Sequence, residues 1–418
     1  MSTFELYSDL RVDGTRLWNS IMEMAKIGPG IAGGSRRLAL TDEDKQGREL
    51  FTQWCADAGC QIKIDDMGNM FATRSGNKGD IAPVTAGSHL DTQPHGGKFD
   101  GVYGVLAALE VIRTLNDHGI ETHAPVEIVN WTNEEGARFA PAMISSGVYA
   151  GLFEKSFAWN RTDVDGKSLK SELERIGYLG EEPCGQHKIG YLLEAHIEQG
   201  PILENERKPI GVVTGGQGQR WYDISIAGQD SHAGSTPMPG RKDALVAASN
   251  IVAGMQKIAN DHPPHGVCTV GEMHVEPNSR NTIPGHIQMT LDIRNPDQGI
   301  LDQMTREVEQ LCHSAAAEQR CELMLEQIWD CPPIVFNEDC IDAVRSAAEH
   351  LDLPNMKMVS GAGHDACQAS HAIATSMIFV PCEGGLSHNE AEYATPDDLT
   401  AGANVLLHAM LALSSLRQ

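Results

Sequence analysis

Five side chains of the types that bind divalent metal ions stand in four short motifs along this 418-residue chain. They are His89 and Asp100 in GSHLDTQPHGGKFDG, Glu135 in NEEGARF, His196 in AHIEQGP and His388 in LSHNEAEY. Imidazole and carboxylate groups are the ligands with which proteins hold first-row divalent metals. One bridging carboxylate would let these five side chains serve two ions. Glu134 would then be free to act as the base of a metal-dependent hydrolysis.

The neighbours of these residues favour a metal site over ordinary surface positions. Asp91 lies two residues after His89 and would orient the imidazole, either directly or through the local backbone. Glu134 and Glu135 are adjacent carboxylates, which repel each other at a buried strand end unless a cation neutralises them. Each motif taken alone is more often a structural or solvated feature. Their joint position near predicted strand ends is what indicates a site.

Alternating strands and helices predict where the motifs meet. Residues 83–88, 126–131 and 191–194 are short segments typical of strands, and each leads to one of the motifs. A helix is expected to begin near Asp100, whereas residues 1–80 are expected to contain helices and loops. This order predicts an α/β domain with a mostly parallel sheet, whose sites form at the carboxyl ends of the strands.

The pattern of elements changes in the middle of the chain. Between residues 215 and 328 the expected order is β-α-β-β-α-β, which is typical of a ferredoxin-like unit. We therefore expect a catalytic domain split into residues 1–214 and 329–418 around an inserted α+β domain of residues 215–328. The glycine-rich and proline-rich boundaries are the expected hinges. The insert is the expected lid and dimerisation domain of a homodimer, because an exposed edge strand or helix can pair across a two-fold axis.

Composition disfavours several classes of partner. A formal net charge of -25 argues against binding to nucleic acid or to an anionic membrane surface. No run of about 18 apolar residues is present, so no membrane span is expected. The ten cysteines form no CxxC pair, which is typical of reduced thiols in a cytoplasmic protein. The first residues are acidic and lack an apolar stretch, so no secretory signal is expected.

Six motifs resemble, in the same order, those of the amidase/hydantoinase/carbamoylase family, which belongs to the di-metal aminoacylase-like metallopeptidases. They are GSHLDTQPHGGKFDGVYG, NEEGARF, HIEQGP, SHAGSTPM, NSRNTIPG and SHNEAEY. The ligand set that the resemblance implies is Asp100 as the bridge, His89 and His196 on one ion, and Glu135 and His388 on the other. It also implies that Glu134 is the general base and that Asp91 supports His89. Zinc is the expected metal, with manganese, cobalt and nickel as alternatives.

A second group of polar residues lies in the insert. Its members are Arg220, His232, Asn281 and Arg294. Arginine reads a carboxylate through two hydrogen bonds and asparagine adds another, which suits an amino-acid-like substrate. By resemblance, Asn281 and Arg294 form a carboxylate clamp. By resemblance too, His232 reaches the active site of the other subunit and polarises the carbonyl there.

The resemblance implies an enzyme that removes the carbamoyl group of an N-carbamoyl amino acid, giving the amino acid, ammonia and carbon dioxide. Within the family, the motif HLDTQP with Gln93 most resembles that of the enzymes that act on N-carbamoyl-β-alanine and N-carbamoyl-L-amino acids. Allantoate amidohydrolase is the alternative, followed by a peptidase or aminoacylase with the same metal centre. A non-catalytic metal-binding protein would have no need of Glu134 as a free base, so the intact NEEG segment argues against that class of protein. Gln199 and Gly363 resemble substrate-contacting residues, and His388 fits the ligand pattern better than His364.

Overall fold

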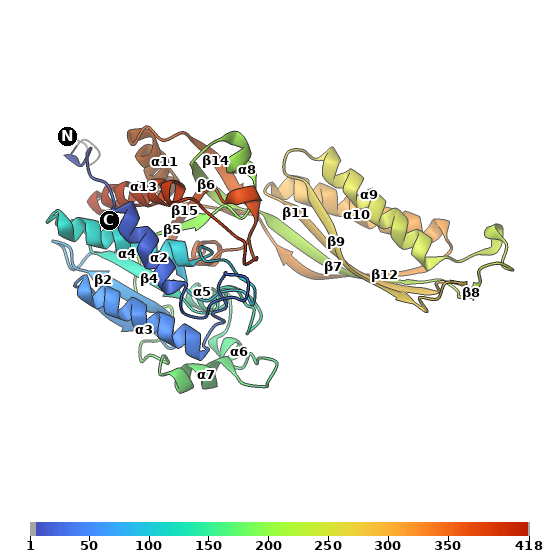
Figure 1. The fold of residues 1–418 in the computed structure, drawn as a ribbon. Coiled ribbons are helices and arrows are strands. Elements are labelled where there is room, and N and C mark those ends of the chain that lie inside the picture. Colours follow the sequence, from blue (N-terminus) through green and yellow to red (C-terminus); the bar gives the residue numbers. More distant parts are fainter. Residues whose placement is uncertain (1–5, 417–418) are drawn as a thin grey trace. The chain divides into compact units, whose positions relative to one another are not determined.

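Two compact units make up the chain in the computed structural model, which describes residues 6–416 (Figure 1). Unit 1 covers the described residues up to Gly215 and those from Val335 onward, and unit 2 is Gly216–Ile334. Unit 1 is an α/β domain, and unit 2 is a separate α+β domain that interrupts it in sequence. The fold class expected from the sequence is therefore confirmed.

Unit 1 is built on a mixed sheet that has nine strands among the described residues, in the order β1-β2-β4-β3-β5-β15-β6-β13, with β14 paired to β6. The strands are β1 (Gln61–Ile64), β2 (Met70–Arg74), β3 (Val84–His89), β4 (Val126–Trp131), β5 (Tyr191–Ile197), β6 (Ile210–Gly216), β13 (Ile334–Val335), β14 (Asn355–Ser360) and β15 (Ala374–Val380). The central strands β4, β3, β5 and β15 are parallel. β3 and β4 are buried along their whole length, which explains why their sequences do not alternate between apolar and polar residues.

Helices surround this sheet. They are α2 (Gly14–Met24), α3 (Asp42–Asp57), α4 (Val102–Asp117), α5 (Ile144–Tyr149), α6 (Lys155–Trp159), α7 (Leu169–Ile176), α8 (Ile202–Glu206), α11 (Glu338–His350), α12 (Asp365–Ala369) and α13 (Pro396–Ser415), with the 3-10 helix η2 (Glu383–Gly385). α4 is buried on most of its surface because it packs between the sheet and the helices α2 and α13. Thr41 caps α3, since its side chain accepts the Asp44 N–H.

Unit 2 is a four-stranded antiparallel sheet in the order β12-β7-β11-β9, with α9 and α10 on one face (Figure 1). Its elements are β7 (Gly218–Ala227), η1 (Met238–Gly240), α9 (Ala244–Asp261), β9 (Val267–Glu276), β11 (His286–Asn295), α10 (Gln298–Glu318) and β12 (Glu322–Cys331), with a short ribbon of β8 (Ser231–His232) and β10 (Thr282–Ile283). Tyr222, Ile224 and Ile226 alternate along β7 and pack into one core with the two helices.

Three local expectations were wrong. Residues 61–74 form the strands β1 and β2 rather than loop, because they pair as a hairpin that continues onto β4. β5 does not end at residue 194: it continues to Ile197 because its pairing with β15 continues, so that His196 lies within the strand. β12 runs to Cys331 rather than to residue 328, since its pairing with β7 resumes after an irregularity.

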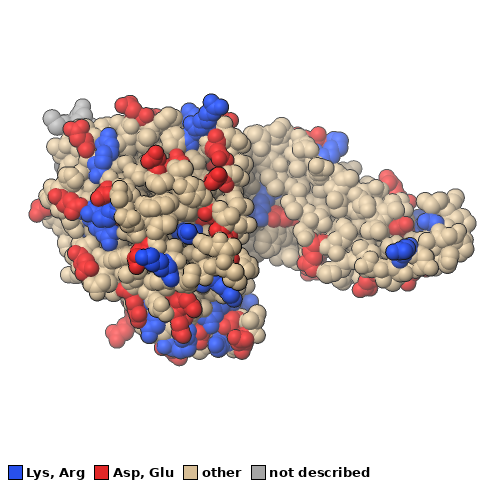
Figure 2. All heavy atoms as spheres, viewed as in Figure 1, with Lys and Arg blue, Asp and Glu red and all other residues tan. Residues whose placement is uncertain are grey.

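Acidic and basic side chains are interspersed on the face of each unit that Figure 2 shows. The helices within residues 6–416 include none with both the length and the apolar character of a membrane span. Five residues at the amino terminus and two at the carboxyl terminus lie outside the described residues. Part of the amino-terminal segment that we considered for a secretory signal is among them.

Candidate metal centre

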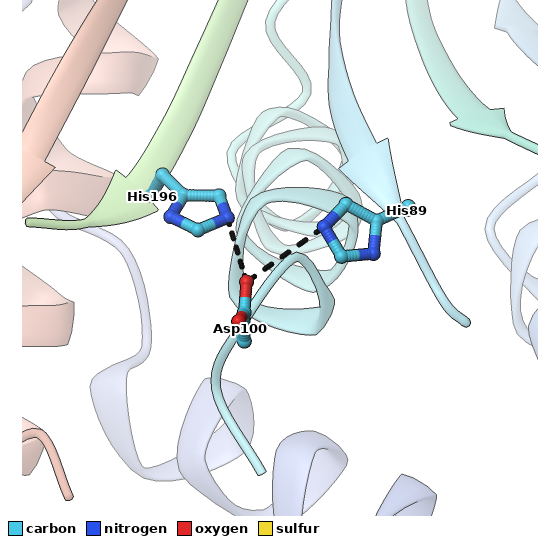
Figure 3. Close-up of side chains that lie close together, drawn as sticks. All are labelled: His89, Asp100 and His196. Carbon is cyan, nitrogen blue, oxygen red and sulfur yellow. Dashed lines mark ion pairs between the residues drawn. The ribbon is translucent and has the colours of Figure 1, made fainter. Parts of the chain in front are cut away.

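Two histidines from adjacent strands point at one carboxylate (Figure 3). His89 is the last residue of β3, His196 lies near the end of β5, and Asp100 precedes α4. The Nε2 atoms of His89 and His196 lie 3.8 and 3.1 Å from Asp100 Oδ1. All three residues are at most 3% exposed. Parallel pairing of β3 with β5 therefore brings together residues that are about a hundred positions apart.

The hydrogen bonds of the two imidazoles show what this cluster can hold. Nδ1 of His89 lies 2.8 Å from the backbone oxygen of Asp91, and Nδ1 of His196 lies 2.9 Å from that of Ile197. A carbonyl oxygen can only accept, so each Nδ1 carries a hydrogen, and the neutral imidazole has its lone pair on Nε2. The Gly101 N–H also donates to Nε2 of His196 at 3.1 Å. Lone pairs thus converge on a carboxylate oxygen, and this donor set fits a divalent cation.

A second group of potential ligands shares the same carboxylate. Nε2 of His388 lies 3.4 Å from Asp100 Oδ2 and 3.4 Å from Glu135 Oε2. The other oxygen of Glu135 is buried and has no hydrogen-bond partner within residues 6–416. Asp100 therefore belongs to two three-residue groups whose ligand atoms are close enough to hold one ion each. All five residues that the sequence singled out are brought together.

Unusual backbone conformations position these side chains. Gly101 has φ +66°, and a Cβ there would lie 2.3 Å from the His89 ring, so only glycine fits between Asp100 and α4. Asn133, Gln199 and His388 have φ of 59°, 57° and 52°, a region that non-glycine residues rarely occupy. Such conformations cluster at functional sites, where the surrounding structure enforces them.

Glu134 and Asp91 complete the polar surroundings of His89. Glu134 Oε2 lies 3.5 Å from His89 Nε2, and Glu134 is 7% exposed. The hydrogen bond of Asp91 to the His89 ring uses the Asp91 backbone oxygen, while its carboxylate accepts the backbone N–H groups of Glu134 and Glu135 at 3.3 Å each. Asp91 therefore supports His89 through its backbone carbonyl, and it holds the adjacent carboxylates through its side chain.

The charges in this pocket change the pKa values of its members. Burial raises the pKa of Glu134 well above its usual value, and the neighbouring carboxylates add to the shift. Burial lowers the pKa of His89 to about 4. Burial also lowers the pKa of His196, but the hydrogen bond and charge of Asp100 outweigh it and raise that pKa to about 9. Without a bound cation, the pocket therefore takes up protons to balance its carboxylates.

The sequence of this chain is similar to those of known proteins. The family model described as "Peptidase family M20/M25/M40" matches residues 85–412. The chain belongs to this M20 family. It is 50% identical to an N-carbamoyl-L-amino-acid amidohydrolase of Rhizobium meliloti, over 97% of this chain and 98% of the relative. It is 36% identical to an N-carbamoyl-L-amino acid amidohydrolase of Geobacillus stearothermophilus, over 96% of this chain and 99% of the relative.

Among solved structures, a hydantoinase/carbamoylase family amidase from Burkholderia multivorans superposes with a TM-score of 0.96. It is 56% identical and the match covers 98% of this chain and 100% of that one. Within the M20 family, the chain therefore groups with the hydantoinase/carbamoylase amidases. The resemblance drawn from the six motifs is confirmed.

Several residues that the sequence analysis named for other reasons make contacts in this M20 site that the sequence did not predict. Gln93 donates to Glu135 Oε2 at 2.6 Å, a contact that its motif did not reveal. Gln199, which we expected to contact substrate, donates to Asp100 Oδ2 at 3.0 Å. Gly363 lies beside His364, whose Nε2 is buried and has no hydrogen-bond partner in the described part of the chain. The His364 ring lies 4.5 Å from that of His196, so it faces the same pocket.

In unit 2, the structure brings together His232 and Asn281. β8 pairs with β10 so that His232 lies opposite Thr282, and the Ala233 N–H donates to the Asn281 carbonyl at 2.9 Å. Nδ1 of His232 accepts two backbone N–H groups, from Gly234 and Ser235. Its Nε2 therefore carries the hydrogen and is available as a donor on an exposed side chain.

The two arginines lie at the other end of the sheet in unit 2. Arg294 pairs with Gln219, whereas His286 pairs with Ala227, so the length of β11 separates Arg294 from the β8–β10 ribbon by about 27 Å. Arg294 donates to the Asp292 carboxylate at 2.7 Å. One copy of unit 2 therefore does not bring Arg294 and Asn281 onto the same carboxylate.

Arg220 is engaged within unit 2. Its guanidinium donates to Asp302 at 2.7 Å, to Asp330 at 3.0 Å and to the Thr305 hydroxyl at 3.0 Å. These contacts join β7 to β12 and α10. They explain the position of Arg220 without a substrate.

We predict that the metal-free protein loses stability as the pH rises from 6.5 to 9. The pKa of His196 is about 9 in the folded metal-free protein and about 6.5 in an unfolded chain. A raised histidine pKa contributes stability that is complete below pH 6.5 and is lost as the pH rises through 9, by up to about 3 kcal/mol here. The raised pKa of Glu134 acts in the same direction, because the unfolded chain ionises this group more readily.

Thermal unfolding of chelated and metal-reloaded protein across this pH range would test the prediction. A divalent cation replaces the proton on His196, so the melting temperature of the reloaded protein should depend less on pH. His196→Asn should flatten the metal-free curve. His408→Asn should leave its slope unchanged, because burial lowers the pKa of His408 to about 4. Parallel curves for metal-free and reloaded protein would contradict the prediction.

Proposed function

We propose that this chain is a metal-dependent amidohydrolase that hydrolyses N-carbamoyl-L-amino acids to the amino acid, ammonia and carbon dioxide. The observation that carries the proposal is the pair of ligand groups that share Asp100, with Glu134 beside them and outside both groups. The names of its relatives supply the substrate class. The substrate has a carboxylate and a ureido group.

Five side chains would hold two divalent cations, with Asp100 as the shared ligand. His89 and His196 would serve one ion, and Glu135 and His388 the other. Zinc is the first choice for mixed imidazole and carboxylate ligands, and manganese, cobalt and nickel also suit them. When bound, the two ions supply Lewis acidity, which favours the ionisation of water and polarises a carbonyl group.

Glu134 would accept the proton of the attacking water. Its carboxylate is buried beside His89 Nε2, and positive charge in the pocket favours the ionised form that a base needs. Attack on the ureido carbon forms a C–O bond, and the bond from that carbon to the amino-acid nitrogen then breaks. Glu134 would deliver its proton to the leaving nitrogen. The carbamate that remains decomposes to ammonia and carbon dioxide.

The residues that we propose for substrate recognition are found in unit 1 and in unit 2. Gln199 and Gly363 lie by the ligand groups in unit 1. His232 offers its Nε2–H to the carbonyl oxygen, and we place it on a second copy of the chain. Asn281 shares the ribbon of His232, so it would arrive with it, while Arg294 remains the candidate cation for the substrate carboxylate. Arg220 is left out of this set because unit 2 already engages it.

A substrate panel tests the function. Ammonia release would be measured for N-carbamoyl-L-amino acids, N-carbamoyl-β-alanine and allantoate, and release of free amino acids for a dipeptide. Each assay would use chelated protein reloaded with each candidate metal. We expect kcat/KM for the preferred carbamoyl amino acid to exceed that for allantoate by about 100-fold, because a polar site rejects analogues that leave its groups unpaired. A higher kcat/KM with allantoate or with the dipeptide would overturn the proposed substrate class.

The role of Glu134 gives a second prediction. Glu134→Gln should keep both ions and the substrate affinity but lower kcat by about 10²–10⁴, the usual contribution of a general base. Glu135→Gln is the matched control, and it should lower the metal content as well. Near wild-type kcat in a metal-loaded Glu134→Gln protein would exclude this residue as the base.

The placement of His232 on a second copy gives a third prediction. His232→Ala and Glu134→Gln homodimers should both be inactive. After random exchange of subunits, each heterodimer has one site with both changes and one site with neither, so activity should return to about one quarter of the wild-type value. If both residues act within one chain, every site carries at least one change and the mixture stays inactive. Sedimentation at micromolar concentration should first show a dimer.

A further inference from the structure

The Glu392 carboxylate joins two distant segments of unit 1 beside the ligand groups. Its Oε1 accepts the backbone N–H groups of Phe99 and Asp100 at 3.1 Å each. Its Oε2 accepts the Ser387 hydroxyl at 2.9 Å. Glu392 is only 4% exposed. The residue that carries the shared carboxylate and the residue that precedes His388 are thus held by one side chain.

The Glu392 side chain is packed closely against the backbone of Gly97. A Cβ at Gly97 would lie 1.9 Å from Glu392 Oε1 and 2.6 Å from its Cβ. Gly97 does not have a positive φ, so this collision is what an alanine there would meet. Ser387 also lies 3.3 Å from Asp100 Oδ2, and it receives a hydrogen bond from Gln199 at 3.0 Å. Glu392 is therefore the outer member of a hydrogen-bonded chain that ends on the shared carboxylate.

We propose that Glu392 is a positioning residue that couples the two halves of the metal centre. It fixes the backbone of Asp100 and the loop of His388 in one arrangement, so that Asp100 faces both groups of ligands at once. The inference rests on the proposed function, because it takes Asp100 and His388 as metal ligands. His388 has φ 52°, a conformation that needs support from its surroundings, and the Glu392–Ser387 bond supplies it.

Glu392 is not itself a ligand in this arrangement. Both of its oxygens already accept hydrogen bonds from unit 1, and it belongs to neither of the groups that share Asp100. A partner that orients a ligand acts on metal affinity, and removing such a partner typically weakens binding by about 10–100-fold. The expected effect of losing Glu392 is therefore weaker binding of the ions rather than loss of a reacting group.

The test is a zinc titration of the metal-free protein against a competing chelator. Glu392→Ala should bind the weaker of the two ions about 10–100-fold less tightly than the wild type. Its kcat at limiting zinc should fall and should recover in excess zinc. Glu392→Gln should stay within about threefold of the wild type, because an amide oxygen can accept the two N–H groups and an amide N–H can donate to Ser387.

Glu110 provides a matched control for the loss of a buried carboxylate. It is fully buried in α4, accepts the Asp13 backbone N–H at 3.1 Å and pairs with Arg16 at 2.7 Å. Glu110→Ala should therefore lower the melting temperature of the protein. It should leave zinc affinity unchanged, because the hydrogen bonds of Glu110 go to Asp13, Arg16 and Thr114, none of which belongs to the metal centre.

Gly97→Ala displaces Glu392 without removing it. It should weaken zinc binding in the same way, and the double variant Gly97→Ala/Glu392→Ala should bind zinc no more weakly than Glu392→Ala alone. This comparison keeps the test decisive if Glu392→Ala folds poorly. Additive losses in the double variant would show that Gly97 acts by another route, and they would count against the coupling.

His388→Ala separates failure of this inference from failure of the proposed function. Suppose that His388→Ala loses one ion while Glu392→Ala binds both ions with an affinity within twofold of that of the wild type. The proposed metal centre is then supported, and the coupling role of Glu392 is wrong. If His388→Ala keeps both ions, the proposed metal centre is itself wrong.

Discussion

Mutual repulsion among buried acceptors is the constraint on which this structure depends. The carboxylate of Asp100 faces lone pairs of His89 and His196 on one oxygen and meets His388 on the other. In a low-dielectric pocket such an arrangement is unfavourable unless positive charge enters it. The parallel order of β4, β3, β5 and β15 and the glycine at position 101 all serve to keep these acceptors together.

The sequence predicted the site best where a histidine or carboxylate side chain lies at or just after the end of a predicted strand. His89 and Glu135 could be placed because a short segment typical of a buried strand precedes each of them, and parallel strands end at one edge. The hairpin β1–β2 was missed because its strands are short, and β1 is partly exposed along its length. Its pairing with β4 is a tertiary contact, which residues 61–74 do not encode locally.

The supporting residues could not be found in the same way. Gln93, Ser387 and Glu392 are single polar residues in loops, where a solvated side chain is the ordinary case. What distinguishes Glu392 is burial and contact with a segment 292 residues away, and neither is visible in the sequence. The separation of Asn281 from Arg294 likewise needed the register of β11 against β7. The types of these two residues suggested a carboxylate clamp. The pairing of β11 with β7 shows that one copy of the chain does not bring the two side chains together.

The order of the ligands along the chain has a consequence for how the protein is made. His89, Asp100, Glu135 and His196 all precede unit 2, and His388 follows it. During synthesis the first four are complete well before His388 leaves the ribosome. Neither β15, which pairs with β5 in the middle of the sheet, nor the loop that carries Glu392 exists at that stage. A nascent chain can thus contain the first ligand group complete and Glu135 of the second, but the second group is complete only after unit 2 and the segment that carries His388 have been translated.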